Sequence, residues 1–186
     1  MVLKKERVIL RVDLTAGTIS REVLSEAFYR LYPGGKALAA YYLLTEMLPN
    51  TDALDPQNLL ILANGLMTGS PVSTTTRYVA AARSPLTNAI GSSEACGYWG
   101  PELKKAGYEA VIITGRAKSP VFLWIDDQNV EIRSAAHLWG LTTADVQETL
   151  RNELEDSRIR VLQTGIAGEN QVRYAGLTND LRHFNG

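Results

Sequence analysis

Residues 64–101 read NGLMTGSPVSTTTRYVAAARSPLTNAIGSSEACGYWGP, and the rest of the chain is organised around this stretch. It holds five of the 15 glycines, most of the Ser and Thr clusters, two arginines and the single cysteine. Small residues let the backbone approach another group closely, and backbone N–H groups and hydroxyls supply many hydrogen-bond donors. The stretch therefore has two interpretations: loops that hold a large polar ligand carrying phosphate, or ordinary glycine-rich turns between strands.

Length and composition describe a globular chain and exclude several functions. Its 186 residues are 45% hydrophobic and 21% charged, and the formal net charge is −1. Without a basic block, nucleic acid is excluded as the main partner. One cysteine excludes an internal disulfide framework and a metal site built from cysteines. The N-terminal ten residues do not resemble a signal peptide and no apolar run reaches 18 residues, so we expect no membrane span and a cytoplasmic location.

The first part of the chain predicts a hairpin followed by helices and strands. Residues 7–14 alternate as a strand, 15–18 form a turn, and 19–23 run back. Residues 25–32 are a short helix or an irregular link, which the proline and glycines at 33–35 interrupt. Helix formers and apolar spacing predict a helix at 36–47. Further elements are expected at these positions: strands at 59–63, 77–83, 88–92 and 110–114, and a helix at 97–106.

The second part predicts the same order of elements. A hairpin at 121–125 and 130–133 turns at 126–129, and Thr142 or Thr143 caps a helix at 144–154. A strand at 159–163, a glycine-containing loop at 165–170 and a strand at 172–176 follow, with no closing helix or strand at 182–186.

The repeated order of hairpin, helix, strand, glycine loop and strand suggests an internal duplication. The aligned parts are residues 7–83 and 121–176, which divide the chain roughly into 1–115 and 116–186. Hairpins outnumber β-α-β crossovers, which favours an α+β fold. We therefore expect a single α+β domain with two stacked, mainly antiparallel sheets and helices outside, each copy contributing one sheet and one helix.

Arg77 and residues 97–100 are the candidates for anion binding. Arg77 follows four Ser and Thr residues and opens a strand, where its planar donor fork suits a phosphate or a heterocycle. A surface ion pair is the alternative. Residues 97–100 (GYWG) open a predicted helix whose free N–H groups favour an anion, or they form a tight turn with two core aromatics.

The remaining reactive residue types give no catalytic centre. Glu94 is either a ligand anchor or a solvated loop carboxylate, and Cys96 has no basic neighbour in sequence that would lower its pKa. The two histidines, His137 and His183, do not form a metal-spaced pair, and no phosphate-binding P-loop is present. The residues alone thus predict a platform for a polar ligand, without a catalytic base or metal ligands.

A set of short motifs resembles the N-terminal domain of the tungsten-containing aldehyde ferredoxin oxidoreductases over nearly the whole chain. Each motif is common alone, and their order makes the resemblance specific. The motifs are RVDLTAG (11–17), PGGK (33–36), ANGLMTG (63–69), Arg77, SPLT (84–87), GYWGPELK (97–104), AGY (106–108), LWG (138–140) and GIAGEN (165–170).

The resemblance implies that this domain is a base for a tungsten or molybdenum bis-pyranopterin cofactor with a bridging magnesium ion. The family's pterin-contacting arginine falls on Arg77. Its two other contact segments fall on Glu94, Ala95, Cys96 and Gly97, and on His183, Phe184, Asn185 and Gly186. The magnesium contacts fall on the backbone carbonyls of Glu94 and Phe184. Family members often have Asn-Ser-Gly-Gly at 94–97, so the close approach available to glycine at 96 is reduced by Cys96 here.

The resemblance further implies oxidation of aldehydes to carboxylic acids, with electrons passing to ferredoxin through a [4Fe-4S] cluster held by later domains. On this hypothesis the chain is a piece of a longer enzyme that can form a homodimer, its partners include those later domains, and alone it is catalytically silent. The alternative is a stand-alone pterin- or nucleotide-binding module, or a subunit that completes a partner's site without its own activity.

Overall fold

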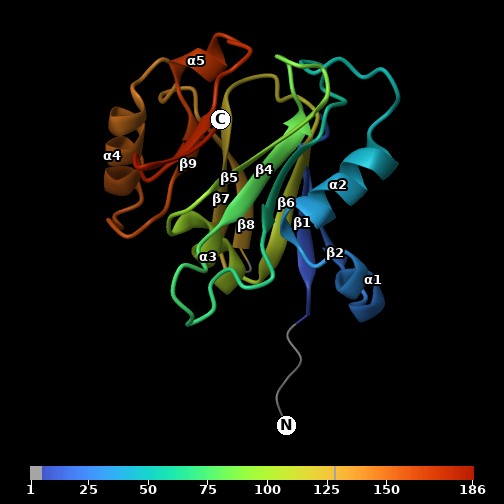
Figure 1. The fold of residues 1–186 in the computed structure, drawn as a ribbon. Helices are drawn as coiled ribbons and strands as arrows, with labels where there is room; N and C mark the ends of the chain where they lie inside the picture. The colour runs from blue at the N-terminus through green and yellow to red at the C-terminus, as the bar shows by residue number, and fades with distance from the viewer. Residues whose placement is uncertain (1–5, 128) are drawn as a thin grey trace.

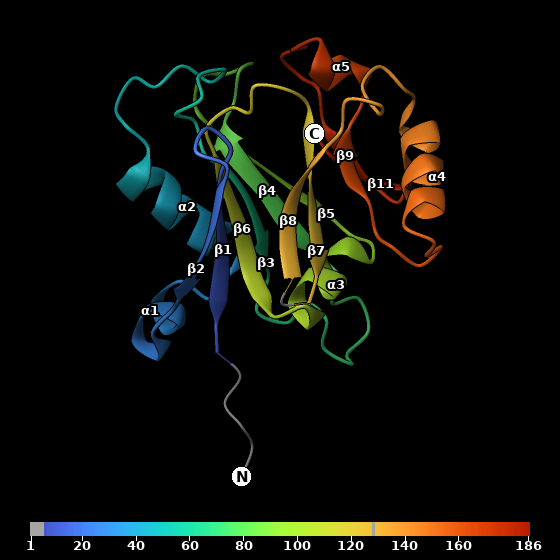
Figure 2. The ribbon, with the colours of Figure 1, turned by 180° about the vertical axis from the view of Figure 1, so that it is seen from behind.

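The computed structural model describes residues 6–127 and 129–186, so Gln128 of the turn expected at 126–129 lies outside the described residues. Within them, one six-stranded sheet forms the centre, with two helices on one face and a hairpin and a third helix on the other (Figures 1 and 2). No helix in these ranges is long and apolar enough to cross a membrane.

The strands are β1 (Val8–Asp13), β2 (Thr18–Val23), β3 (Leu60–Asn64), β4 (Tyr78–Arg83), β5 (Ile90–Ala95), β6 (Tyr108–Thr114), β7 (Val121–Asp126), β8 (Asn129–Ser134), β9 (Leu162–Thr164), β10 (Leu177–Asn179) and β11 (His183–Asn185). The helices are α1 (Glu26–Leu31), α2 (Gly35–Glu46), α3 (Trp99–Lys105), α4 (Thr143–Glu153) and α5 (Ile166–Glu169).

The central sheet has the order β2-β1-β6-β3-β4-β5, which leaves β5 at one edge. Neighbouring strands in it are antiparallel except for the pair β1 and β6. The hairpin β7–β8 forms a separate two-stranded sheet, and β11-β10-β9 form a third sheet. The third sheet and α4 lie beyond the β5 side of the molecule, away from α1 and α2 (Figure 1).

Successive side chains of the central strands point to opposite faces of the sheet, and each face packs against other elements. On β3, Ile61 and Ala63 pack with α1 and α2, whereas Leu62 points to the opposite face. On that opposite face, Leu103 of α3 and apolar residues of β7 and β8 complete a second cluster. The inner strands β1, β3, β4 and β6 therefore read as nearly continuous apolar runs, because both of their faces are covered.

Local signals place the helices. The Ser25 hydroxyl accepts a hydrogen bond from the Phe28 amide at the start of α1, and Thr142 does the same for Asp145 at the start of α4. Gly34 precedes α2 with φ +85°, and a β-carbon there would lie 2.3 Å from the Asn64 carbonyl oxygen. The glycine thus lets the start of α2 cross the end of β3, where the two chains form a bridge between Gly34 and Gly65.

The α+β class is confirmed, whereas the division into sheets and helices differs from the expectation. We expected one sheet and one helix from each half of the chain. The first half instead forms the central sheet with three helices, and the second forms two small sheets. The internal duplication and the single-domain organisation stay predictions.

Three local predictions near the C-terminus were wrong. The strand expected at 172–176 begins later, at Leu177, and the loop at 165–170 contains the short helix α5. The segment at 182–186 contains strand β11, which pairs with β10 through Leu177 and Asn185. Strands of three residues show too little alternation to be found from sequence.

A buried carboxylate, Glu109 on β6, joins three parts of the chain. It accepts hydrogen bonds from Arg7 (2.7 Å), from the Tyr29 hydroxyl (2.9 Å) and from Lys104. Burial raises the pKa of the Glu109 carboxyl, but the hydrogen bond and charge of Lys104, with Arg7 and Tyr29, outweigh it and lower the pKa. Lys104 also reaches the Gly65 carbonyl (3.5 Å), which ties this cluster to the loop before Arg77.

Glu109→Gln removes the negative charge that two cations share in this cluster. Breaking a buried ion pair from one side costs about 3 kcal/mol, because the remaining charges stay partly buried. We expect chemical denaturation of the chain to show a loss of this size. Glu102→Gln, which removes an exposed pair with Lys105, should cost less than about 1 kcal/mol. Equal losses in the two variants would contradict a special role for Glu109.

The lowered pKa of Glu109 also predicts a pH dependence. Its contribution to stability is complete above the ordinary pKa of 4.5 and is lost as the pH falls through the lower pKa of the folded state. The difference in unfolding free energy between the wild type and Glu109→Gln should therefore narrow in acid. A difference that stays constant from neutral pH to about pH 3 would contradict this assignment.

Candidate functional site

The two predicted contact segments, 94–97 and 183–186, lie against each other although they are far apart in sequence. The Asn185 side-chain amide donates to the Ser93 carbonyl (3.0 Å), and the Gly186 amide donates to the Ser93 hydroxyl (3.1 Å). Segment 94–97 begins on edge strand β5 and ends where α3 starts, whereas 183–186 contains β11. The structure therefore brings together residues that the sequence alone left in separate halves.

Arg77 is held at the same end of the sheet by the polar loop before it. The buried Thr68 hydroxyl donates to the Arg77 carbonyl and accepts a hydrogen bond from the Gly65 amide. The backbone at Arg77 is thus fixed, while 64% of its side chain stays exposed to solvent. Serines and threonines of this loop serve mainly to stabilise its own turns, as the Thr75 hydroxyl does with the carbonyls of Ser70 and Val72.

Glu94 forms ion pairs with Arg77 and with Lys36. Its carboxylate oxygens lie 2.9 Å from Lys36 Nζ and 3.3 Å from Arg77 Nη1. The hydrogen bond and charge of Lys36, followed by those of Arg77, hold the pKa of the Glu94 carboxyl below its ordinary value. The interpretation of Glu94 as a solvated loop carboxylate was right about its exposure and wrong about its place, because Glu94 is exposed but lies on β5 and pairs with two cations. The ion pair expected as the alternative role of Arg77 is present.

Gly97 is required by packing. Its φ is +110°, and a β-carbon there would lie 2.2 Å from Asn179 Oδ1 and 2.9 Å from His183 Cδ2. Asn179 is fully buried, and its Nδ2 donates to the Cys96 carbonyl and to the Tyr78 hydroxyl, each at 3.0 Å. Burial raises the pKa of Tyr78 to about 12. Sequence reasoning missed Asn179, since no signal separates it from an ordinary turn asparagine.

The predicted site residues differ in how much surface they offer a ligand. Ala95 and Gly97 are buried, and Cys96 and His183 are half-buried. Phe184 is 67% exposed, and Glu94 and Gly186 are exposed. The side chains that are exposed and so available to a ligand are therefore those of Arg77, Glu94 and Phe184.

The aromatic residues of the GYWG motif have separate roles. Trp99 packs on the Tyr78 ring with a centroid distance of 4.9 Å, whereas Tyr98 is exposed and lies under the Arg160 guanidinium at 4.5 Å. The tight-turn alternative expected both aromatic side chains in the core. Trp99 is partly buried beside the site, in agreement with it, whereas Tyr98 is exposed.

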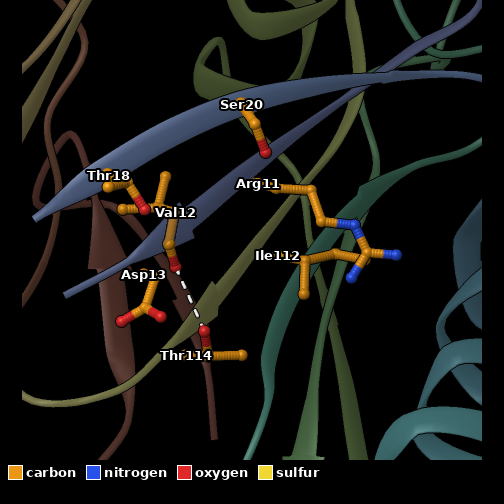
Figure 3. A pocket seen from close by; sticks show the side chains of 7 residues that line it. All are labelled: Arg11, Val12, Asp13, Thr18, Ser20, Ile112 and Thr114. Atoms are coloured by element: carbon orange, nitrogen blue, oxygen red, sulfur yellow. Dashed lines mark hydrogen bonds between the residues drawn. The ribbon is translucent and has the colours of Figure 1, made fainter. Parts of the chain in front are cut away.

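A separate hollow lies at the opposite edge of the sheet. Its volume is about 180 Å³, and it is lined by Arg11, Val12, Asp13, Thr18, Ser20, Ile112 and Thr114 (Figure 3). The Arg11 guanidinium is engaged by Glu22 and Glu46. None of the lining residues belongs to the predicted contact segments, so the candidate site differs from this hollow; the exposed side chains of Arg77, Glu94 and Phe184 place it on an open surface.

The residues of the open surface suit an anionic, planar ligand. Arg77 and Lys36 are exposed cations that can bind phosphate, and Phe184 in the adjoining segment has an exposed ring. Within the described ranges no group of three His, Cys, Asp or Glu side chains could hold a metal ion. A metal held here therefore needs ligands from a cofactor or from backbone carbonyls, and the expected carbonyls of Glu94 and Phe184 stay a prediction.

Comparison with known proteins identifies a family. Residues 9–186 match the family model described as aldehyde ferredoxin oxidoreductase, N-terminal domain. The tungsten-containing aldehyde ferredoxin oxidoreductase of Pyrococcus abyssi is 43% identical over 92% of the chain, and that of Thermococcus kodakarensis is 38% identical over the same share. The chain spans 28% of the length of each of these relatives.

Relatives with other names are nearly as similar. The aliphatic sulfonate oxidoreductase, WOR-like subunit, of Pyrococcus furiosus is 35% identical over 96% of the chain. A solved structure of the active-site complex BamBC of benzoyl coenzyme A reductase with 1,5-dienoyl-CoA has a TM-score of 0.93 and 37% identity. The matched region covers 96% of this chain and 27% of the chain in that solved structure.

Gly97→Ala should strain the site because the new methyl group meets Asn179. We expect a loss of about 3 kcal/mol or more in unfolding free energy, from the positive φ and the contact together. Gly140→Ala is the matched control: its φ is +83° with nothing within 4 Å of the β-carbon, so it should cost only about 1 kcal/mol. Equal losses on denaturation would show that the contact with Asn179 does not matter.

Proposed function

The chain belongs to the aldehyde ferredoxin oxidoreductase family, as its N-terminal domain, and from this premise we propose that segments 94–97 and 183–186 with Arg77 hold the family's tungsten pterin cofactor. Molybdenum in place of tungsten belongs to the same proposal. When bound, the cofactor supplies the oxidation chemistry, and the residues of this chain bind and orient it.

The adjacency of the two segments is the observation that carries this proposal. Ser93 is hydrogen-bonded to both Asn185 and Gly186, so the backbones of the two segments form one continuous surface beside Arg77. The Arg77 guanidinium would donate to a phosphate or to the pterin ring, and Lys36 adds a second cation. Glu94 now pairs with both cations, so an anionic ligand would compete with its carboxylate for them.

The proposal also includes a magnesium ion, for which this chain would supply some of the ligands, and an iron–sulfur cluster, for which it would supply none. A magnesium ion bridging the cofactor phosphates would take backbone carbonyl oxygens, at Glu94 and Phe184, as hard cations do. A [4Fe-4S] cluster would be held by other domains of the same protein. This division agrees with a chain that spans 28% of its aldehyde ferredoxin oxidoreductase relatives.

The proposed reaction of the whole protein converts an aldehyde and water to a carboxylic acid, releasing two protons and two electrons. A [4Fe-4S] cluster held by other domains would carry these electrons to ferredoxin. A cytoplasmic location and a homodimer belong to the same proposal, and the chain alone is expected to be inactive because the metal's remaining surroundings come from other domains.

Two further substrate classes are supported by the comparisons. The sulfonate oxidoreductase and benzoyl-CoA reductase relatives are 35% and 37% identical to this chain, close to the 38% of one aldehyde-oxidising relative. Sequence identity in this domain is therefore only slightly higher to the aldehyde ferredoxin oxidoreductases than to the other two relatives, and it favours aldehydes as substrates only to that extent. An assay of the full-length protein with aldehydes, with sulfonates and with an aromatic CoA thioester separates the three.

Metal and pterin analysis of the full-length natural protein tests the cofactor proposal. We expect tungsten or molybdenum together with pterin in the wild type, and aldehyde-dependent reduction of a ferredoxin or a dye. Arg77→Gln should lower cofactor affinity roughly ten-fold or more, because a hydrogen bond from a charged donor is lost.

Arg83→Gln is the matched control, since Arg83 ends the same strand and its guanidinium binds Asn88 (2.9 Å). It should leave cofactor content unchanged. A wild-type protein without metal and pterin would contradict the cofactor proposal, and unchanged affinity in Arg77→Gln would remove Arg77 from the site.

A further inference from the structure

We infer that Asn179 and Asn185 are positioning residues that set the spacing between the two cofactor-contact segments. We call them the asparagine clamp. The inference rests on the proposed function and deepens it, because it concerns two side chains that would hold the contact segments in place by bonding to the protein backbone rather than to the cofactor.

The clamp acts on the backbone of segment 93–96 from two points. Asn185 Nδ2 donates to the carbonyl of Ser93, and Asn179 Nδ2 donates to the carbonyl of Cys96, both at 3.0 Å. These two carbonyls flank Glu94 and Ala95, the first two residues of the first contact segment. Asn179 and Asn185 in turn flank His183 and Phe184 of the second. Each segment is therefore fixed on both sides of the residues that would face the ligand.

The join between the two sheets depends on these side chains. β11 pairs with β10 in its own sheet, and β5 is the last strand of the central sheet. The described strands do not continue from β5 to β11 as a ladder, so side-chain amides take the place of backbone pairing. The clamp asparagines are 0% and 3% exposed, which excludes water as an easy substitute for either donor.

The rigid surroundings of Asn179 make its position definite. Its Oδ1 lies against the α-carbon of Gly97, where a β-carbon would come within 2.2 Å. Its Nδ2 also donates to the buried hydroxyl of Tyr78 on β4. Asn179 thus contacts β4, the Gly97 turn and its own hairpin at once. A shift of its side chain would move the first contact segment relative to the second.

Asp replacements remove the donors with little change of shape. Asn179→Asp removes two donated hydrogen bonds and places a carboxylate beside the Cys96 carbonyl, whereas Asn185→Asp removes one. Asn58→Asp is the matched control: Asn58 Nδ2 donates to the carbonyls of Ala53 (2.8 Å) and Arg83 (3.0 Å), at the end of β4 opposite Tyr78. All three variants are made in the full-length protein.

The measurements are metal and pterin content per chain, cofactor affinity, and the Tm difference between protein produced with and without tungstate or molybdate. A ligand raises the Tm of the folded state in proportion to its binding free energy. If an asparagine is merely structural, its replacement lowers the Tm of the protein produced with the metal and of the protein produced without it, and the difference between the two stays unchanged. If the asparagine positions the site, its replacement also reduces this difference.

We expect cofactor affinity to fall roughly ten-fold or more in Asn179→Asp and about five-fold in Asn185→Asp, with a smaller Tm difference in each. Asn58→Asp should lower the Tm of both forms and keep cofactor content and the Tm difference. If Asn179→Asp does not fold, Asn185→Asp decides the question.

Two outcomes overturn the inference in distinguishable ways. A wild-type protein without pterin and metal overturns the proposed function and the clamp with it. A wild type that holds the cofactor, with wild-type affinity and Tm difference in folded clamp variants, overturns the clamp alone.

Discussion

The candidate site depends on hydrogen bonds from two buried amides to the backbone of an edge strand. Asn185 joins the small C-terminal sheet to β5, Asn179 joins it to Cys96 just after β5, and no ladder between described strands makes that join. A buried side-chain amide that loses its acceptor is costly, so these contacts fix the hairpin in one place. Gly97 belongs to the same constraint, because only a residue without a β-carbon leaves room for Asn179. The shape of the surface beside Arg77 follows from this packing.

A second constraint connects that surface to the core. Glu109 holds Lys104, and Lys104 reaches the carbonyl of Gly65, where the polar loop begins. Thr68 then hydrogen-bonds the backbone of Arg77 at the end of the loop. The arginine is therefore mounted on a fixed backbone while its side chain stays exposed. This arrangement suits a residue that binds a ligand, since the cost of ordering the main chain is met during folding.

Much of the fold was predictable from local patterns, and the sheet partners were not. Alternation at 7–14 and 19–23 gave the first hairpin, and Thr142 gave the start of α4, because these signals act between near neighbours. The parallel pairing of β1 with β6 joins residues about 100 positions apart, and no local pattern encodes it. Strands β10 and β11 are three residues long, which is too short for a period to be visible.

The site was predicted through family resemblance more than through chemistry. The motifs led to 94–97 and 183–186, which the structure brings together, whereas residue types alone gave only a polar platform. Lys36 was missed as a partner of Glu94, and the clamp was missed because buried asparagines leave no pattern in a single sequence.

The most direct test of this account is an anomalous-diffraction map of the full-length protein, recorded at the absorption edge of the bound metal. The account predicts a single strong peak on the cofactor side of the surface formed by Arg77, residues 94–97 and residues 183–186. A peak away from this surface, for example at the hollow beside Arg11, or no peak at all, would contradict it.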